Sequence, residues 1–200
     1  VVTLPKITAP AQVSTLVTAF EALEHGLKLP AHSLKMEFMV ETTQSIVDSD
    51  GAIMLPLLLT AARGRCVAAH FGVYDFTASN DITAQYQRMR HPACDFAKHM
   101  MKMAYAGTGL WLSDGATNIM PVGPHRAEPG KSLTAEQTEA NTRAVHGAWR
   151  LHADDIRHSL EGGYFQGWDL HPAQLATRYA AVYAFFLAGL ASASERLSNF

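Results

Sequence analysis

The chain has 200 residues, of which 48% are hydrophobic, and this is enough for one sizeable core. Its formal net charge of −2 gives no electrostatic basis for binding nucleic acid or an anionic membrane surface. Only two cysteines are present, Cys66 and Cys94, far apart and outside any CxxC spacing, which indicates buried thiols in a reducing compartment. The longest apolar stretch, Ala180–Leu190, is about half as long as a membrane span. We therefore expect a soluble, cytoplasmic protein without a membrane segment.

Strand-like and helical segments alternate along the chain, and helix signals mark several boundaries: Gly after a helix, Pro at a first helical position, and a Thr-x-x-Gln capping box. The predicted strands are Val1–Ile7, Leu34–Glu41, Arg65–Gly72, Leu110–Ser113 and Gly163–Trp168. The predicted helices are Ala11–His25, Ala52–Arg63, one from Pro92 to Gly107, one from Thr134 to about Leu160, and one from Pro172. Between them, Met120–Lys131 is rich in Pro and Gly and is predicted to be a long loop.

The order of these elements predicts an α/β protein with a parallel sheet, because the strands are almost continuously apolar. A closed (β/α)8 TIM barrel needs eight strands and typically about 250 residues. The chain is therefore either an open sheet or the C-terminal five or so strand–helix units of an incomplete barrel. A strand that begins at residue 1, with no initiator Met, favours the incomplete barrel. We see no internal repeat and predict a single domain over residues 1–200.

Two acids follow the second and third predicted strands. Glu41 and Asp75 fall at carboxyl ends, where α/β folds place their chemistry. Two carboxylates that converge there could hold a hard divalent cation. Glu41 could instead be a helix cap or a solvated strand end, and Asp75 could cap the next helix.

Neighbouring residues on these strands add to the pattern. Glu37 shares one strand face with Glu41 because side chains alternate, and two acids on one apolar strand are costly unless they are paired or liganded. Lys6, at the end of the first strand, could pair with either. Gly72 would permit a tight turn or a close backbone approach. His70 is either a hydrogen-bonded core histidine or a ligand.

Two further candidates lie beyond the later strands. Asp114, before Gly115, is either a turn residue or an active-site acid. His171 forms a cluster with Asp169 and Gln174 after the last strand, and it could act as a general acid or base. It could equally cap the helix that begins at Pro172.

Four of these segments together resemble the HpcH/HpaI aldolase and citrate lyase β-subunit family, which belongs to the pyruvate/phosphoenolpyruvate-binding barrels. Leu4–Lys6 looks like the family's "LPK" strand, and Val40–Thr42 looks like its "IET" strand. Phe71–Asp75 is similar to its "FGxxD" turn, and Gly167–Gln174 looks like its "GkxxIHPxQ" segment. The segments occur in the family's order over about residues 1–190. Their amino-acid sequence looks closest to an aldolase-like branch of the family.

The resemblance implies that Glu41 and Asp75 bind Mg²⁺ or Mn²⁺, and that the ion stabilises an enolate while a carbon–carbon bond is cleaved or formed. The substrate would be a pyruvate- or oxaloacetate-like 2-oxo acid, with an aldehyde or an acyl-CoA as a second reactant. The family's Arg from an earlier strand has no counterpart in these residues. The site residues that we expect beside the metal ligands are Lys6, Asp114 and His171 as catalytic groups, and Glu37, His70 and Gly72 as substrate-binding groups.

The sequence is also compatible with other functions. The family's Lys before Ile-His-Pro is not matched, because Gln166–Asp169 stands there, and this weakens the case for acyl-CoA. The Met120–Lys131 loop could act as a lid. The chain could instead be a non-catalytic barrel fragment that binds a metabolite or assembles with a partner, or a decarboxylase or hydrolase of the same superfamily. We also expect a homo-oligomer.

Overall fold

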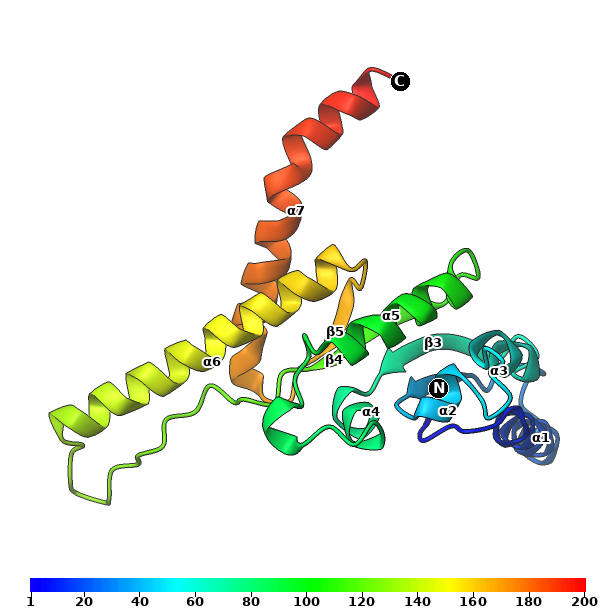
Figure 1. Ribbon diagram of the computed structural model, residues 1–200, viewed down its shortest axis with the longest axis horizontal. Helices are drawn as coiled ribbons and strands as arrows, with labels where there is room; N and C mark the ends of the chain where they lie inside the picture. Colours follow the sequence, from blue (N-terminus) through cyan, green and yellow to red (C-terminus); the bar gives the residue numbers. More distant parts are fainter. The chain divides into compact units, whose positions relative to one another are not determined.

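The computed structural model describes residues 1–200 and divides into two compact units, Val1–Gly115 and Ala116–Phe200. Five strands alternate with helices along the chain (Figure 1), which confirms the predicted α/β class. The single domain expected from the sequence stays a prediction.

The first unit contains four parallel strands in the order β1–β2–β3–β4. Its strands are β1 (Val2–Leu4), β2 (Met36–Val40), β3 (Cys66–Phe71) and β4 (Trp111–Ala116), whose last residue begins the second unit. Its helices are α1 (Pro10–Leu27), α2 (Thr43–Ile46), α3 (Leu55–Ala61), α4 (Val73–Ser79), the short η1 (Ala84–Tyr86) and α5 (Pro92–Tyr105). The β2–β3 register places Val40 opposite Phe71, so the two strands end level with each other.

The core of this unit lies between one face of the strands and helices α1, α3 and α5. Phe38 and Val40 alternate onto this face from β2, and Ala69 and Phe71 do so from β3. The buried residues that the helices contribute include Val13, Val17, Leu58, Ala97 and Met101. Glu37, Met39 and Glu41 consequently belong to the opposite face, away from these helices.

Several of the predicted elements differ from those in the structure by a few residues, among them the fourth and fifth strands, which span Trp111–Ala116 and Gln166–Trp168. The first strand ends at Leu4, so Lys6 lies beyond it, with a left-handed φ of 50°. The helix that was predicted to start at Ala52 begins at Leu55, because residues before it form an isolated bridge between Val47 and Ile53.

The second unit contains α6 (Ala135–Glu161), β5 (Gln166–Trp168), the short η2 (Pro172–Gln174) and α7 (Leu175–Ser198). The predicted capping box of α6 is confirmed: Thr134 Oγ1 accepts from the backbone N–H of Gln137, and the Gln137 side chain accepts from that of Thr134. α7 packs against α6, and its C-terminal half extends beyond α6 (Figure 1). The predicted loop is also confirmed, since no helix or strand occurs between Thr117 and α6.

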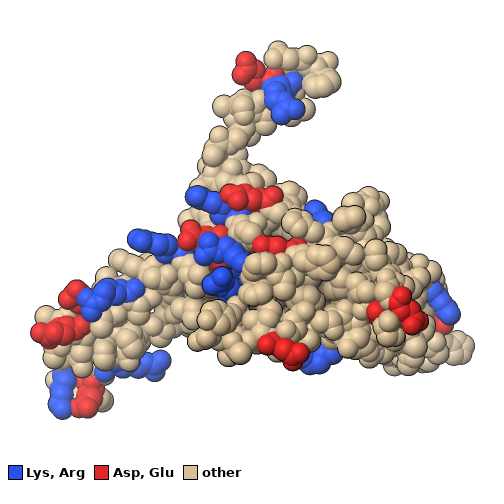
Figure 2. Space-filling view, in the orientation of Figure 1, with Lys and Arg blue, Asp and Glu red and all other residues tan.

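One helix, Pro172–Ser198, is long and apolar enough by length and composition to cross a membrane, with a mean hydropathy of 1.3 over its most apolar window. No residue of that window is buried in this unit, and uncharged side chains dominate the middle of α7 in Figure 2. Helices that bury an apolar surface against a partner share this composition, so the absence of a membrane segment stays a prediction.

Charges of both signs are interspersed over the face shown in Figure 2, as expected from the near-neutral net charge. Cys66 and Cys94 are both free and buried, as predicted. Burial raises the pKa of each thiol to about 12, so neither is a reactive thiolate near neutral pH.

Candidate functional site

Glu41 and Asp75 meet at the carboxyl edge of two neighbouring parallel strands. Glu41 follows the last residue of β2, and Asp75 lies in the first turn of α4, directly after β3. Because β2 and β3 pair in register, the chain delivers both acids to the same edge. Each of the two carboxyl groups influences the pKa of the other. The structure thus brings together the two residues that were predicted to bind a metal.

Gly72 gives Glu41 the space it occupies. A Cβ atom at Gly72 would lie 2.6 Å from the Glu41 Cβ and 2.8 Å from its Oε2. The φ of Gly72 is −93°, which other residues can adopt, so this position does not need glycine for a turn. Of the two roles considered from the sequence, the structure shows the close approach.

Lys6 contacts both acids. Its Nζ lies 2.7 Å from Asp75 Oδ2, and its backbone N–H donates to Glu41 Oε1 at 2.8 Å. The expected pairing of Lys6 with Glu41 occurs through the backbone N–H of Lys6, while its ammonium binds Asp75, because Lys6 lies past the end of β1 and turns its side chain toward α4. The cationic partner of the carboxylate pair is nevertheless within this chain.

The two acids have different protonation tendencies. Burial raises the pKa of Glu41, whose residue is 7% exposed, although the backbone bond from Lys6 opposes the shift. The hydrogen bond from the Lys6 ammonium lowers the pKa of Asp75, against a smaller effect of burial. Asp75 is therefore the more readily ionised member of the pair, and Glu41 is the more readily protonated one.

These residues fit a site for a hard divalent cation. They supply two carboxylates with oxygen donors, and Mg²⁺ is commonly held by one or two carboxylates, with waters and substrate oxygens completing its octahedral shell. No group of three or more His, Cys, Asp or Glu residues forms a closed metal cage in the chain. Any cation bound here would keep open positions.

The predicted substrate-binding residues Glu37 and His70 bind each other. His70 Nε2 lies 2.9 Å from Glu37 Oε2, which also accepts a hydrogen bond from Thr3 Oγ1 at 3.2 Å. Glu37 shares a strand face with Glu41 by alternation, and His70 lies opposite Met39 on that same face. This hydrogen-bonded pair therefore lies on the strand face that carries Glu41, with Met39 between Glu37 and Glu41 on β2.

Asp114 lies on the other side of the sheet. It is buried against α5, where Lys98 Nζ approaches its Oδ2 to 3.0 Å and the N–H of Gly115 donates to its Oδ1. The structure thus brings Asp114 to Lys98 and not to Glu41 or Asp75. Sequence reasoning missed Lys98, although a lysine three residues after Asp95, among apolar residues of the same helix, is a signal of a buried ion pair.

His171 lies in the second unit, where it caps η2. Its Nδ1 accepts from the backbone N–H of Ala173 at 3.1 Å, and its own N–H donates to Gln174 Oε1. This is the capping alternative that the sequence left open, and no further role of His171 is tested.

Asp169, two residues earlier, is held by Arg178, whose Nε and Nη2 donate to the carboxylate at 2.9 to 3.1 Å. Gly167 makes room for this contact, because a Cβ there would lie 2.7 Å from Arg178 Nη1. His152 of α6, which is buried, approaches Asp169 Oδ1 to 3.0 Å. No local sequence pattern points to Arg178 or His152 as part of this cluster.

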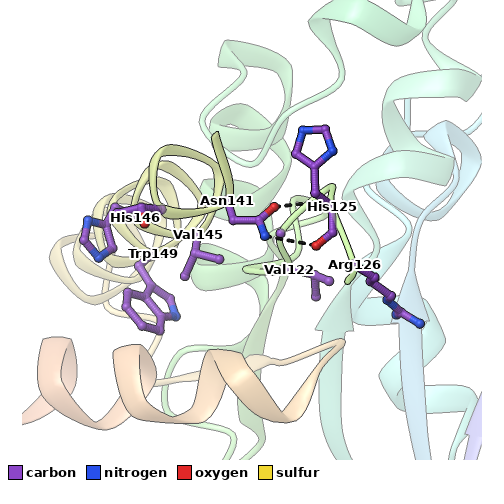
Figure 3. Close-up of a pocket in the computed structure, with 9 residues that line it drawn as sticks. Val122, His125, Arg126, Asn141, Val145, His146 and Trp149 are labelled. Atoms are coloured by element: carbon purple, nitrogen blue, oxygen red, sulfur yellow. Dashed lines mark hydrogen bonds between the residues drawn. The ribbon is translucent and has the colours of Figure 1, made fainter. Parts of the chain in front are cut away.

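An open cleft of about 450 Å³ lies in the second unit, between the 117–134 loop and α6 (Figure 3). Asn141 of α6 holds the loop through two hydrogen bonds. Its Oδ1 accepts from the backbone N–H of His125 at 2.9 Å, and its Nδ2 donates to the carbonyl oxygen of His125 at 3.0 Å. The side chains of His125 and Arg126 point in different directions, away from Asn141 (Figure 3). None of the predicted site residues lines this cleft.

Several solved structures share the fold. A citrate lyase from Burkholderia xenovorans LB400 is 21% identical with a TM-score of 0.63, and the match covers 95% of this chain and 54% of that one. The citrate lyase β subunit of M. tuberculosis, complexed with oxaloacetate and magnesium, is 15% identical with a TM-score of 0.53, covering 90% and 60%. A Haloferax volcanii malate synthase in a pyruvate/acetyl-CoA ternary complex is 16% identical with a TM-score of 0.57, covering 90% and 40%.

At these identities the likeness establishes the fold alone, and this chain spans about half the length of the structures that it matches. No curated protein sequence matches it. The sequence profile described as "Domain of unknown function (DUF6986)" matches residues 1–200.

Proposed function

We propose that this chain, which belongs to the DUF6986 family, supplies the metal-binding carboxylates of a Mg²⁺- or Mn²⁺-dependent carbon–carbon lyase that acts on a 2-oxo acid. The observation that carries the proposal is the convergence of Glu41 and Asp75 at the carboxyl edge of β2 and β3, where Lys6 contacts both. The similar citrate lyase β subunit complexed with oxaloacetate and magnesium supports the substrate class and the ion.

Glu41 and Asp75 would hold the cation through their carboxylate oxygens. A divalent ion bound there supplies Lewis-acid stabilisation for the negative charge that develops on the keto oxygen of a 2-oxo acid during carbon–carbon cleavage or formation. Glu37 fixes the ring of His70 through Nε2, and the pair would contact the substrate from the sheet face that also carries Glu41. Catalytic roles for Asp114 and His171 stay predictions. In the structure, Asp114 forms a buried ion pair with Lys98, and His171 caps η2.

A second candidate is a non-catalytic barrel fragment that binds a metabolite or assembles with a partner. The observation that favours it is the chain's span of about half the length of the similar structures. An enzyme of this class would need a further cationic group from an earlier strand, as the family resemblance implies. In the absence of such a group, the carboxylate pair would bind a cation without turnover.

The test uses the full-length gene product with a panel of 2-oxo acids and aldehydes, with and without Mg²⁺ or Mn²⁺. We expect metal-dependent turnover that falls roughly a thousandfold in a Glu41→Gln, Asp75→Asn double variant, because Lewis-acid stabilisation contributes several kcal/mol. Direct Mn²⁺ binding, measured by the loss of the free-ion electron paramagnetic resonance signal, should disappear in the same variant.

The matched control is Glu128→Gln, Glu139→Gln, which removes two carboxylates from exposed ion pairs and should leave both readouts unchanged. Unchanged turnover in the Glu41/Asp75 double variant would contradict the proposal, and Mn²⁺ binding without any turnover would favour the non-catalytic candidate. Product analysis with oxaloacetate separates lyase chemistry from decarboxylation. A small 2-oxo acid, with an aldehyde or acyl-CoA as second reactant, is the proposed partner, and a cytoplasmic homo-oligomer is the proposed form.

A further inference from the structure

Lys6 contacts both Glu41 and Asp75, the two acids of the carboxylate pair. Its ammonium lies 2.7 Å from Asp75 Oδ2 while its backbone N–H donates to Glu41 Oε1 at 2.8 Å. The two acids come from different strand ends, and Lys6 comes from a third segment after β1. A single cationic residue thus stands where the negative charges converge.

We propose that the Lys6 ammonium is the resident counter-ion of the Glu41–Asp75 pair, and that a divalent cation binds to this pair by displacing the ammonium from Asp75. This inference rests on the proposed function, because it assumes that the pair accepts a divalent ion. It adds a residue that sets the affinity of the site for the ion and that the family resemblance does not assign to this role.

The Lys6 ammonium occupies an oxygen that a metal ion would need. A carboxylate oxygen that accepts a hydrogen bond from an ammonium at 2.7 Å offers fewer lone pairs to a metal ion. A positive charge held against Asp75 also repels a divalent ion that approaches the same oxygens. While the Lys6–Asp75 contact persists, the pair therefore presents a weaker site than two bare carboxylates.

Displacement of the ammonium is nevertheless easy. The side chains of Lys6 and Asp75 are 63% and 56% exposed, and exposed ion pairs contribute little to stability. Lysine carries its charge on a flexible stem, so the ammonium can move into water without movement of the backbone. The backbone bond to Glu41 does not involve the ammonium and can persist after the ion has bound.

The backbone of Lys6 permits an unusually clean variant. Its φ of 50° lies in the left-handed region, which glycine adopts more readily than lysine does. Lys6→Gly therefore removes the ammonium, relieves the backbone and keeps the N–H that Glu41 accepts. Lys6→Met removes only the charge while keeping a side chain of similar length. If Lys6→Met is too unstable to measure, Lys6→Gly remains informative, because relief of the left-handed backbone offsets part of the lost stability.

The experiment measures Mn²⁺ affinity by electron paramagnetic resonance in the wild-type protein and in four variants. We expect Lys6→Met and Lys6→Gly to bind Mn²⁺ roughly tenfold more tightly, since one unit charge beside the site is removed and solvent screening moderates the gain. Lys6→Arg, which keeps the charge, should bind about as the wild type does. The matched control is Lys131→Met, which removes the ammonium of an exposed 2.7 Å ion pair with Glu128; it should have no effect.

A second readout follows the ammonium itself. Mass spectrometry after brief amine acetylation reports how accessible Lys6 is, and Mn²⁺ should increase its labelling in the wild-type protein while leaving that of Lys131 unchanged. Wild-type binding that is equal to or tighter than that of both Lys6→Met and Lys6→Gly overturns the inference and leaves the proposed function standing. If neither the wild type nor any Lys6 variant binds Mn²⁺, both this inference and the proposed function are overturned. Binding by the uncharged variants alone would support the inference.

Discussion

The position of the Glu41 carboxylate depends on a missing methyl group at Gly72. The backbone of Gly72 lies against Glu41, and its N–H donates to the carbonyl oxygen of Val40 at 2.9 Å, which keeps β2 and β3 level at this edge. A Cβ there would meet the Glu41 Cβ, an atom fixed by the backbone, at 2.6 Å. A larger residue would therefore have to move Glu41 or separate the two strand ends.

A Gly72→Ala variant should weaken Mn²⁺ binding by about tenfold or more and cost about 1–3 kcal/mol of stability, the range typical of overpacking a filled site. The measurements are Mn²⁺ titration and urea denaturation. Gly26→Ala is the matched control, because nothing lies within 4 Å of the Cβ it would add in α1. It should stabilise the protein by about 0.5–1 kcal/mol and leave Mn²⁺ binding unchanged. Wild-type Mn²⁺ affinity in Gly72→Ala would contradict this account of Glu41.

The sequence predicted Glu41 and Asp75 because strand alternation and the carboxyl ends of strands are local features. It did not predict the partner of Lys6, since the left-handed turn after Leu4 sends the side chain to a residue 69 positions later, and nothing local encodes that direction. The buried Arg65–Glu24 pair was missed for the same reason: its members are 41 residues apart, and each is unremarkable in its own segment.

At the scale of elements, the strands and the longer helices were predicted within a few residues, because their apolar periodicity extends over several turns or alternations. The short helices α2 and α4, of four and seven residues, were not predicted. The omission matters for α4, which places Asp75 in its first turn rather than in a loop.

The loop before α6 is fixed to that helix by one asparagine. Asn141 makes both hydrogen bonds to the backbone of His125, and Gly123 passes so close that a Cβ there would lie 2.5 Å from the Asn141 Cγ (Figure 3). A loop rich in Pro and Gly thus has a defined attachment near its middle. If this loop acts as a lid, opening requires these contacts to break.

Gly123→Ala and Asn141→Ala should each release the loop, because the first clashes with the asparagine and the second removes both hydrogen bonds, at about 0.5–1.5 kcal/mol each. We expect trypsin to cleave after Arg126 and Lys131 roughly fivefold faster in both variants, as local opening becomes more frequent. Gly147→Ala, on α6 with open space around its Cβ, is the control. Unchanged cleavage in both variants would show that the loop is held elsewhere.

At the scale of the whole molecule, the two units carry different buried ionisable groups. In the first unit, Arg65 donates two hydrogen bonds to Glu24, at 2.7 and 2.8 Å, and two backbone N–H groups add to them. These bonds lower the pKa of Glu24 from 4.5 to about 2. Because the folded form holds this proton less tightly than the unfolded form, the stabilisation is complete above pH 4.5 and is lost as the pH falls toward about 2.

In the second unit, His152 of α6 is buried and lies close to Asp169, which Arg178 also binds. Burial lowers its pKa below the ordinary value of 6.5, and the positive charge of Arg178 adds to this effect, while Asp169 opposes it. The unfolded chain therefore binds a proton near pH 6.5 that the folded unit resists. The stability of this unit is fully present above that pH and declines as the pH falls through it, well before Glu24 begins to titrate.

Acidification should therefore loosen the second unit first. Hydrogen exchange followed by mass spectrometry, corrected for the intrinsic effect of pH, should show protection falling in α6 and α7 between pH 7 and pH 5, while β1–β4 stay protected until the pH drops below about 4.5. His152→Gln keeps a polar side chain but cannot gain the charge, so it should remove this early loss. The same early loss in His152→Gln, or simultaneous loss in both units, would mean that another group controls the acid response.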